Sequence, residues 1–333
     1  MYLHQSPLSH LHPPSKKPPS PPNPNALSLL FHTFDRSLLR LLRSLLVPAP
    51  SEAGTTPGVV SFSYLSRAAG VVSSVHAVAG AMFADPSVSG YDEAAFASYI
   101  GSSIKLLDVC NAVSAEIERL HLGRLLLVFV AHLLSSSGGA PPPEKVRKAR
   151  ESIREWEESF PKGRRIGAAA AGLVRDLHRR DPPPSGKATA LGLAVFAVES
   201  VSALVAGALV AFLGGEVDVA AGTEVPPEFD WASAFDELQT ALSGKIVGAS
   251  PCEMEAVKAS MRKLADIMDG SADDGEKTEE RLRSAVKELS RATEDITEGL
   301  DRLCGAVNEL FRAVLGTRNT ALRRFRLGPN KCK

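Results

Sequence analysis

The feature that most constrains this sequence is an uninterrupted heptad pattern near its C-terminal end. Ten positions step alternately by four and three residues, and nine of them are apolar: Leu282, Val286, Leu289, Thr293, Ile296, Leu300, Leu303, Val307, Leu310 and Val314. A spacing of 3.5 residues places these side chains along one seam of a helix, and packing against other helices must bury that seam. The repeat therefore predicts a long C-terminal helix with a seam of about 50 Å. We expect its partners to lie in the same chain, and Thr293 is a candidate for fixing the register.

The rest of the chain also favours helices over strands. Aromatic residues make up only 6% of the sequence, while Ala, Leu and Val dominate. Helical spacing of apolar residues predicts further helices at 27–47, 62–83, 92–134, 144–160, 165–179, 188–213, 230–247 and 251–268. The predicted fold class is all-α, an elongated bundle of about eight helices over 27–326. A proline-rich tail at 1–26 is expected to be disordered, and a short basic tail is expected at 327–333.

Two local patterns give finer predictions. In Ser250-Pro251-Cys252-Glu253, Ser250 is expected to cap a helix, with Pro251 in its first position and Glu253 reaching back to the cap. His76 falls in the apolar seam of the segment 62–83. No other His, Cys or carboxylate stands near it at metal-ligand spacing. We therefore expect a hydrogen-bonded core histidine there instead of a metal ligand.

The segment 188–213 leaves two interpretations open. It is 26 residues long and its single charge is Glu199, so it is long enough to span a bilayer, which takes about 20 apolar residues. A carboxylate at the bilayer centre costs about 2.5–3.5 kcal/mol on insertion scales, however. A helix that is apolar on all sides is equally typical of the buried centre of a bundle.

Basic residues cluster in two places. Arg36, Arg40 and Arg43 share one face of the segment 27–47, which could lie on an anionic membrane surface or dock on the bundle with its arginines in water. Residues 312–333 contain seven bases and no acid, after an acidic stretch at 269–301. This polarity suits the dipole of the last helix, and a contact with anionic lipid is the alternative.

The sequence suggests a cytoplasmic protein. Its four cysteines, at positions 110, 252, 304 and 332, are far apart and form no C-x-x-C pair, which favours reduced thiols. No secretory signal peptide is evident. Residues 1–34 lack Asp and Glu and contain several serines, as an organelle transit peptide would, but their many prolines fit a disordered tail.

No catalytic, cofactor-binding or metal-binding motif is recognisable. The pairs Gly186-Lys187 and Gly244-Lys245 lack the upstream glycine and the following Ser or Thr of a phosphate-binding loop. The basic stretches lack the interleaved aromatic residues that bind single-stranded nucleic acid. The sequence thus predicts a protein that is not an enzyme, with no cofactor, no metal and no nucleic acid partner.

Residues 88–134 resemble the signature helix of the plant BYPASS-related family. The resemblance is carried by Lys105-Leu106-Leu107-Asp108, then Cys110-Asn111, then Ser114 and Glu116. Asp230-Trp231-Ala232 with Phe235 resembles the Trp-Ala motif of the family, and 287–326 fits its closing helix. The signature residues are Lys105, Asp108, Cys110, Asn111, Glu116 and Trp231, and the resemblance assigns them no role.

The resemblance implies a plant developmental regulator that restrains a root-derived mobile signal which arrests shoot growth. A sister branch is associated with the secretory machinery, so partner proteins are expected, and an anionic membrane surface is a second candidate. Two alternatives remain open. One is a membrane-integral regulator anchored by 188–213, and the other is an enzyme of signal-precursor metabolism that would use a polar group such as His76 or Glu199.

Overall fold

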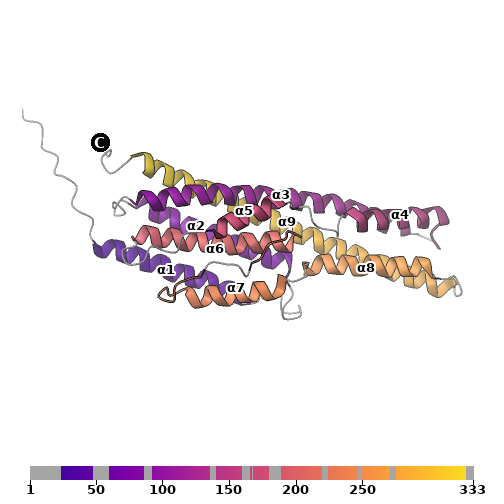
Figure 1. Cartoon of the computed structure of the whole chain (residues 1–333). Helices are drawn as coiled ribbons and strands as arrows, with labels where there is room; N and C mark the ends of the chain where they lie inside the picture. Colours follow the sequence, from indigo (N-terminus) through magenta and orange to yellow (C-terminus); the bar gives the residue numbers. More distant parts are fainter. Residues whose placement is uncertain are drawn as a thin grey trace, which may run out of the picture.

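The computed structural model describes residues 24–47, 60–85, 92–135, 140–159, 166, 168–179, 189–219, 224–246, 250–270 and 275–327. Over these residues the chain forms nine helices and no strand: α1 Pro24–Leu46, α2 Phe62–Ala84, α3 Glu93–Leu134, α4 Pro143–Ser159, α5 Ala168–His178, α6 Ala190–Phe212, α7 Ala232–Ile246, α8 Cys252–Asp269 and α9 Gly275–Leu327. They form the elongated bundle seen in Figure 1, which confirms the all-α prediction. The predicted tails at 1–26 and 327–333 lie almost wholly outside the described residues, and the domain boundaries stay predictions.

The longest helix, α9, runs the length of the molecule and organises it (Figure 1). All ten residues of the heptad seam are buried, and they face α2, α3 and α8 of the same chain. The expectation of partners within the chain is therefore correct. Thr293 does not fix the register by a hydrogen bond, because its hydroxyl donates to the carbonyl of Leu289 in its own helix at 2.7 Å.

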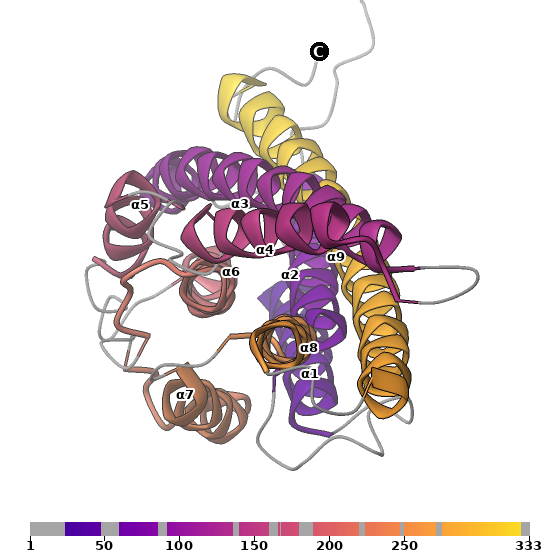
Figure 2. The same ribbon diagram turned by 90° about the vertical axis from the view of Figure 1, so that its right-hand side faces the viewer.

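The apolar helix α6 lies inside the bundle, in contact with α1, α2, α3, α5 and α7 (Figure 2). Every one of its residues from Ala194 to Phe212 is buried. Within the described part of the chain, α2 and α6 are the two helices with the length and hydropathy to cross a membrane. The bundle buries 50% of the most apolar 18-residue stretch of α2 and 94% of that of α6. Burial on all sides is the situation of a core helix.

The start of α8 differs from the sequence prediction. Pro251 takes the capping position without a side-chain hydrogen bond, and the Ser250 hydroxyl accepts from Lys258 Nζ at 3.1 Å. In its own helix the carboxylate of Glu253 accepts from the thiol of Cys252, at 3.4 Å, instead of from the capping residue. Both of its oxygens accept from the backbone N–H of Phe62, at 3.1 and 3.2 Å, and so satisfy the first turn of α2. The predicted capping box was wrong because a neighbouring helix start competes for the same carboxylate.

The C-terminal end of α2 is completed by α9. The guanidinium of Arg324 donates to the carbonyls of Phe83, at 3.0 Å, and Ala84, at 2.8 Å. These carbonyls belong to the last turn of α2, where no helical N–H follows to bond them and where a positive charge is favourable. At least one base of the C-terminal cluster therefore has a structural role within the bundle.

A close approach of α2 and α9 gives a test of this packing. A Cβ atom at Gly299 would lie 2.9 Å from Phe62 Cβ, whereas one at Gly305 would have no neighbour within 4 Å. We expect Gly299→Ala to lower the free energy of unfolding by about 1–3 kcal/mol through overpacking. Gly305→Ala should raise it by up to about 1 kcal/mol through helix propensity. Urea unfolding of both variants measures this, and equal effects would contradict the close α2–α9 contact.

Candidate functional site

The structure divides the signature residues into buried and exposed ones. On α3, Cys110 and Glu116 are buried, whereas Asp108 and Asn111 are exposed. Lys105 donates from Nζ to the carbonyl of Asp176 at 3.3 Å, which ties α3 to α5. The signature residues therefore do not converge on one site.

The thiol of Cys110 is held in its neutral form. Burial raises its pKa to about 12, and the thiolate is the reactive form of cysteine. Its 3% exposure places it in the hydrophobic core. Cys110 therefore serves as a small core residue at neutral pH.

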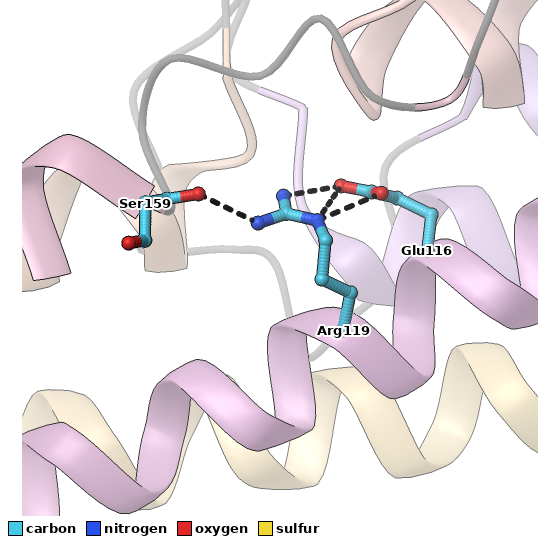
Figure 3. A network of polar contacts seen from close by, with 3 residues as sticks. All are labelled: Glu116, Arg119 and Ser159. Carbon is cyan, nitrogen blue, oxygen red and sulfur yellow. Dashed lines mark hydrogen bonds and ion pairs between the residues drawn. The ribbon is translucent and has the colours of Figure 1, made fainter.

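Glu116 forms a buried ion pair that fastens α4 to α3 (Figure 3). Arg119 approaches both carboxylate oxygens, with Nε 2.9 Å from Oε2 and Nη2 2.5 Å from Oε1. Its remaining nitrogen, Nη1, donates to the carbonyl of Ser159 at the end of α4, at 3.0 Å. The exposed fractions of Arg119 and Glu116 are 18% and 4%, so water screens the pair little. Glu116 thus positions Arg119, which bonds α4, whereas Asp108 and Asn111 face solvent.

Trp231 anchors the start of α7 on α6. It is fully buried, and its ring lies 5.4 Å from that of Phe229, 5.6 Å from Phe235 and 6.4 Å from Phe196 of α6, measured between centroids. The edge-on contact with Phe235 is an arrangement that aromatic rings prefer. The Trp-Ala motif therefore makes an aromatic cluster in the core.

His76 is the centre of a polar layer that crosses α2, α3 and α6. Its Nδ1 lies 2.8 Å from the hydroxyl of Tyr99, and its Nε2 lies 3.1 Å from the hydroxyl of Ser202. The hydroxyl hydrogen of Ser202 is donated to the carbonyl of Val198. The oxygen of Ser202 must therefore accept from Nε2–H, which leaves Nδ1 to accept from Tyr99. The expected core histidine is found with both nitrogens bonded.

Burial sets the protonation of this layer. It lowers the pKa of His76 to about 3, so the ring is neutral, and it raises the pKa of Tyr99. The carbonyl of His76 accepts from the Thr317 hydroxyl at 2.8 Å, which brings α9 to the same level. Tyr99 and Ser202 were not among the residues expected near His76, because no local pattern pairs residues that are 23 and 126 positions apart.

Glu199, the single charge of the segment 188–213, is bonded across the α3–α6 contact. Its Oε1 accepts from the hydroxyls of Ser98, at 2.9 Å, and Ser102, at 2.7 Å. These two serines are one turn apart on α3 and meet the same oxygen. The carboxylate therefore has hydrogen-bond partners in the bundle that a bilayer would not provide. Over the described residues, no three His, Cys, Asp or Glu side chains are grouped so that they could hold a metal ion.

The outer face of α3 carries a second heptad pattern, which we call the α3 stripe. Its nine residues step by four and three, and every one is exposed: Ile104, Asp108, Asn111, Ala115, Glu118, Leu122, Leu125, Phe129 and His132. Heptad spacing on an exposed face places these side chains where another helix could lie along them. Two signature residues, Asp108 and Asn111, belong to this stripe. The α3 stripe is thus the part of the signature helix that is available for recognition.

Comparison with known proteins places the chain in a plant family. A family model described as Protein ROH1-like matches residues 154–325, which is more than half of the chain. The chain therefore belongs to the ROH1-like family. Its relatives include BYPASS-type proteins, as the signature residues indicated.

Three curated relatives extend the match to most of the chain. UPF0496 protein 4 of Oryza sativa subsp. japonica is 30% identical over 289 residues, which are 81% of this chain and 60% of the relative. Its counterpart in subsp. indica is 30% identical over 283 residues, with the same coverage. Protein BPS1, chloroplastic, of Arabidopsis thaliana is 27% identical over 251 residues, 72% of this chain and 68% of the relative. The chain thus spans 60% of the length of the rice relatives. No solved structure matches the chain.

The lowered pKa of His76 predicts a pH dependence of stability. Between the ordinary pKa of 6.5 and the folded value of about 3, the unfolded chain binds a proton that the folded chain does not. Stability from this group is therefore complete above pH 6.5 and is lost as pH falls. From pH 7.5 to 5.0 the loss is about 2 kcal/mol. His76→Gln should abolish this contribution. Between pH 7.5 and 5.0 the free energy of unfolding of this variant should therefore fall by about 2 kcal/mol less than that of the wild type. Parallel pH profiles from urea unfolding would contradict it.

Proposed function

We propose that this protein is a non-enzymatic regulator of plant development of the BYPASS type, which acts through contacts between its helices and partner proteins. The observation that carries the proposal is the 27% identity to Protein BPS1, chloroplastic, over 72% of the chain. None of the matched names is that of an enzyme. The process it regulates is the restraint of a root-derived mobile signal that arrests shoot growth, as its BYPASS-type resemblance implies.

The use of the buried polar groups supports a binding role. His76 is neutral and bonded on both sides, and Glu199 accepts from two serines of α3. Glu116 is paired with Arg119. Each of these groups holds helices together, and Cys110 is a neutral core thiol. Recognition is therefore assigned to the surface, where the α3 stripe offers a continuous exposed face. Proteins of the secretory machinery are the first partners to test.

The proposal is tested by complementation of Arabidopsis plants that lack Protein BPS1. Expression of this chain should restore shoot growth, and in grafts its expression in the rootstock alone should suffice because the restrained signal moves from root to shoot. Gly305→Ala is a suitable control, since that position has open space. Continued shoot arrest, with the protein accumulating at normal level in the root, would contradict the proposed function.

For the membrane alternatives, we propose peripheral contact in place of a spanning helix. The most apolar stretch of α6 is 94% buried in the bundle. Insertion of α6 into a bilayer would therefore lose this packing and the hydrogen bonds of Glu199. Arg36, Arg40 and Arg43 of α1, in contrast, are all exposed. Such a basic face can approach anionic lipid headgroups, with about 1 kcal/mol for each base near the surface.

Fractionation of plant cells separates these alternatives and locates the protein. Protein in the membrane pellet should be released by high salt and by sodium carbonate, because peripheral contact is electrostatic. Retention after carbonate and release only by detergent would show that α6 spans the membrane. Chloroplasts and cytosol are collected separately, because the name of one relative places it in chloroplasts.

A further inference from the structure

Exposed apolar side chains are concentrated on α3. The described residues include eight large hydrophobic side chains that are exposed, and five of them belong to this helix: Ile104, Leu122, Leu125, Val128 and Phe129. Leu122 and Leu125 are 63% and 54% exposed and Phe129 is 44% exposed. All three belong to the α3 stripe, and they lie within two helical turns of one another. Scattered exposed leucines are ordinary on protein surfaces, but a contiguous group marks an interaction site.

We propose that the α3 stripe binds a basic amphipathic helix of a partner protein. This inference rests on the proposed function and identifies the surface and the chemistry of the partner. The apolar half of the stripe, Leu122 to Phe129, would receive the apolar face of the partner helix at heptad spacing. The other half of the stripe, from Asp108 to Glu118, would contact the polar, basic end of the partner helix.

The charges of the stripe specify a basic partner. Its ionisable residues are the acids Asp108 and Glu118 and, at the far end, His132. Within the described structure neither acid has an ion pair, and the basic side chains beside them on α3 have other partners. His121, one turn after Glu118, lies 3.5 Å from Asp301 of α9. Lys105 donates to Asp176 of α5, and Arg119 is held by Glu116. Lys or Arg residues of a partner helix would therefore complement both acids.

A hollow beside the stripe contains one further carboxylate that a basic partner could reach. It lies between α3 and α9 and is lined by Arg124, Val128 and Ala131 on one side and by Glu294 and Glu298 on the other. Val128 is 50% exposed and joins the hollow to the apolar half of the stripe. Glu298 is paired with Arg302 of its own helix at 2.9 Å, which leaves Glu294 as the carboxylate of this lining with no ion pair in the described structure. A long basic side chain of a helix on the stripe could reach Glu294.

A second copy of this chain fits the stripe less well. Parallel pairing would set Asp108 and Glu118 against the same residues of the other copy, which like-charge repulsion opposes. Antiparallel pairing centred on Leu125 overlaps the stripe only from Glu118 to His132, about 21 Å of helix. Asp108 and Asn111 would then lie beyond the contact. A single longer helix of another protein covers the entire stripe.

The test is photo-crosslinking of the full-length chain in plant cells, with benzoylphenylalanine in place of Leu125. Leu315 of α9, which is 38% exposed and lies outside the stripe, is the matched control position. Mass spectrometry then gives the sequence of the crosslinked peptide. We expect a peptide with apolar residues at heptad spacing and several Lys or Arg residues, at higher yield from position 125 than from 315. Asp108→Lys combined with Glu118→Lys should lower that yield about fivefold, as expected for the loss of two exposed ion pairs.

Several outcomes would overturn the inference. One kind is a crosslink to a second copy of the chain, to lipid or to an acidic peptide. The other kind is a yield at position 125 that is no higher than at 315, or that the double charge reversal leaves unchanged. The complementation assay separates the two proposals. Restored shoot growth without the crosslink rejects the α3 stripe alone, whereas the crosslink without restored growth rejects the developmental role alone.

Discussion

The packing of the α9 seam against α2 and α3 is the contact on which the rest of the structure depends. Its ten heptad residues are buried over more than 30 residues of helix, and α8 covers the N-terminal part of the same helix. With α2 and α3 held in this way, a trough forms that α6 fills and that α1, α5 and α7 close. Apolar burial supplies the stabilisation, but it is not directional. The angular placement of α6 needs contacts of another kind.

Hydrogen bonds between buried groups supply that direction. His76 links α2 with α3 and α6, and Glu199 links α6 with α3. A shift of α6 by one residue would leave these groups unbonded in the core, at a cost of about 1–3 kcal/mol for each neutral group and more for the carboxylate. A few polar residues therefore select one arrangement among the many that Ala- and Val-rich helices could adopt.

Sequence periodicity was a good guide wherever one helix face is buried. The α9 seam and the seam from Phe62 to Phe83 are buried as predicted, because 3.5-residue spacing has one low-energy solution. It was a poor guide to partners across the chain. Glu253 caps α2 instead of α8, and Tyr99 and Ser202 surround His76, since such pairings depend on tertiary structure. The family resemblance likewise assigned no role to the signature residues, and only the structure separates the buried Glu116 from the exposed Asp108 and Asn111.

Both ends of α2 are completed by residues far along the chain. Its first turn receives Glu253, 191 residues away, and its last carbonyls receive Arg324, 240 or more residues away. During synthesis, α2 leaves the ribosome early. Ser61 can cap its first turn at once, through the N–H of Tyr64, but the N–H of Phe62 must wait for Glu253 and the last carbonyls must wait for Arg324. This helix is therefore among the first to be synthesised and among the last to be completed. A pause late in translation would prolong a state in which apolar α2 and α6 are exposed together, and chaperones would recognise the protein in that state.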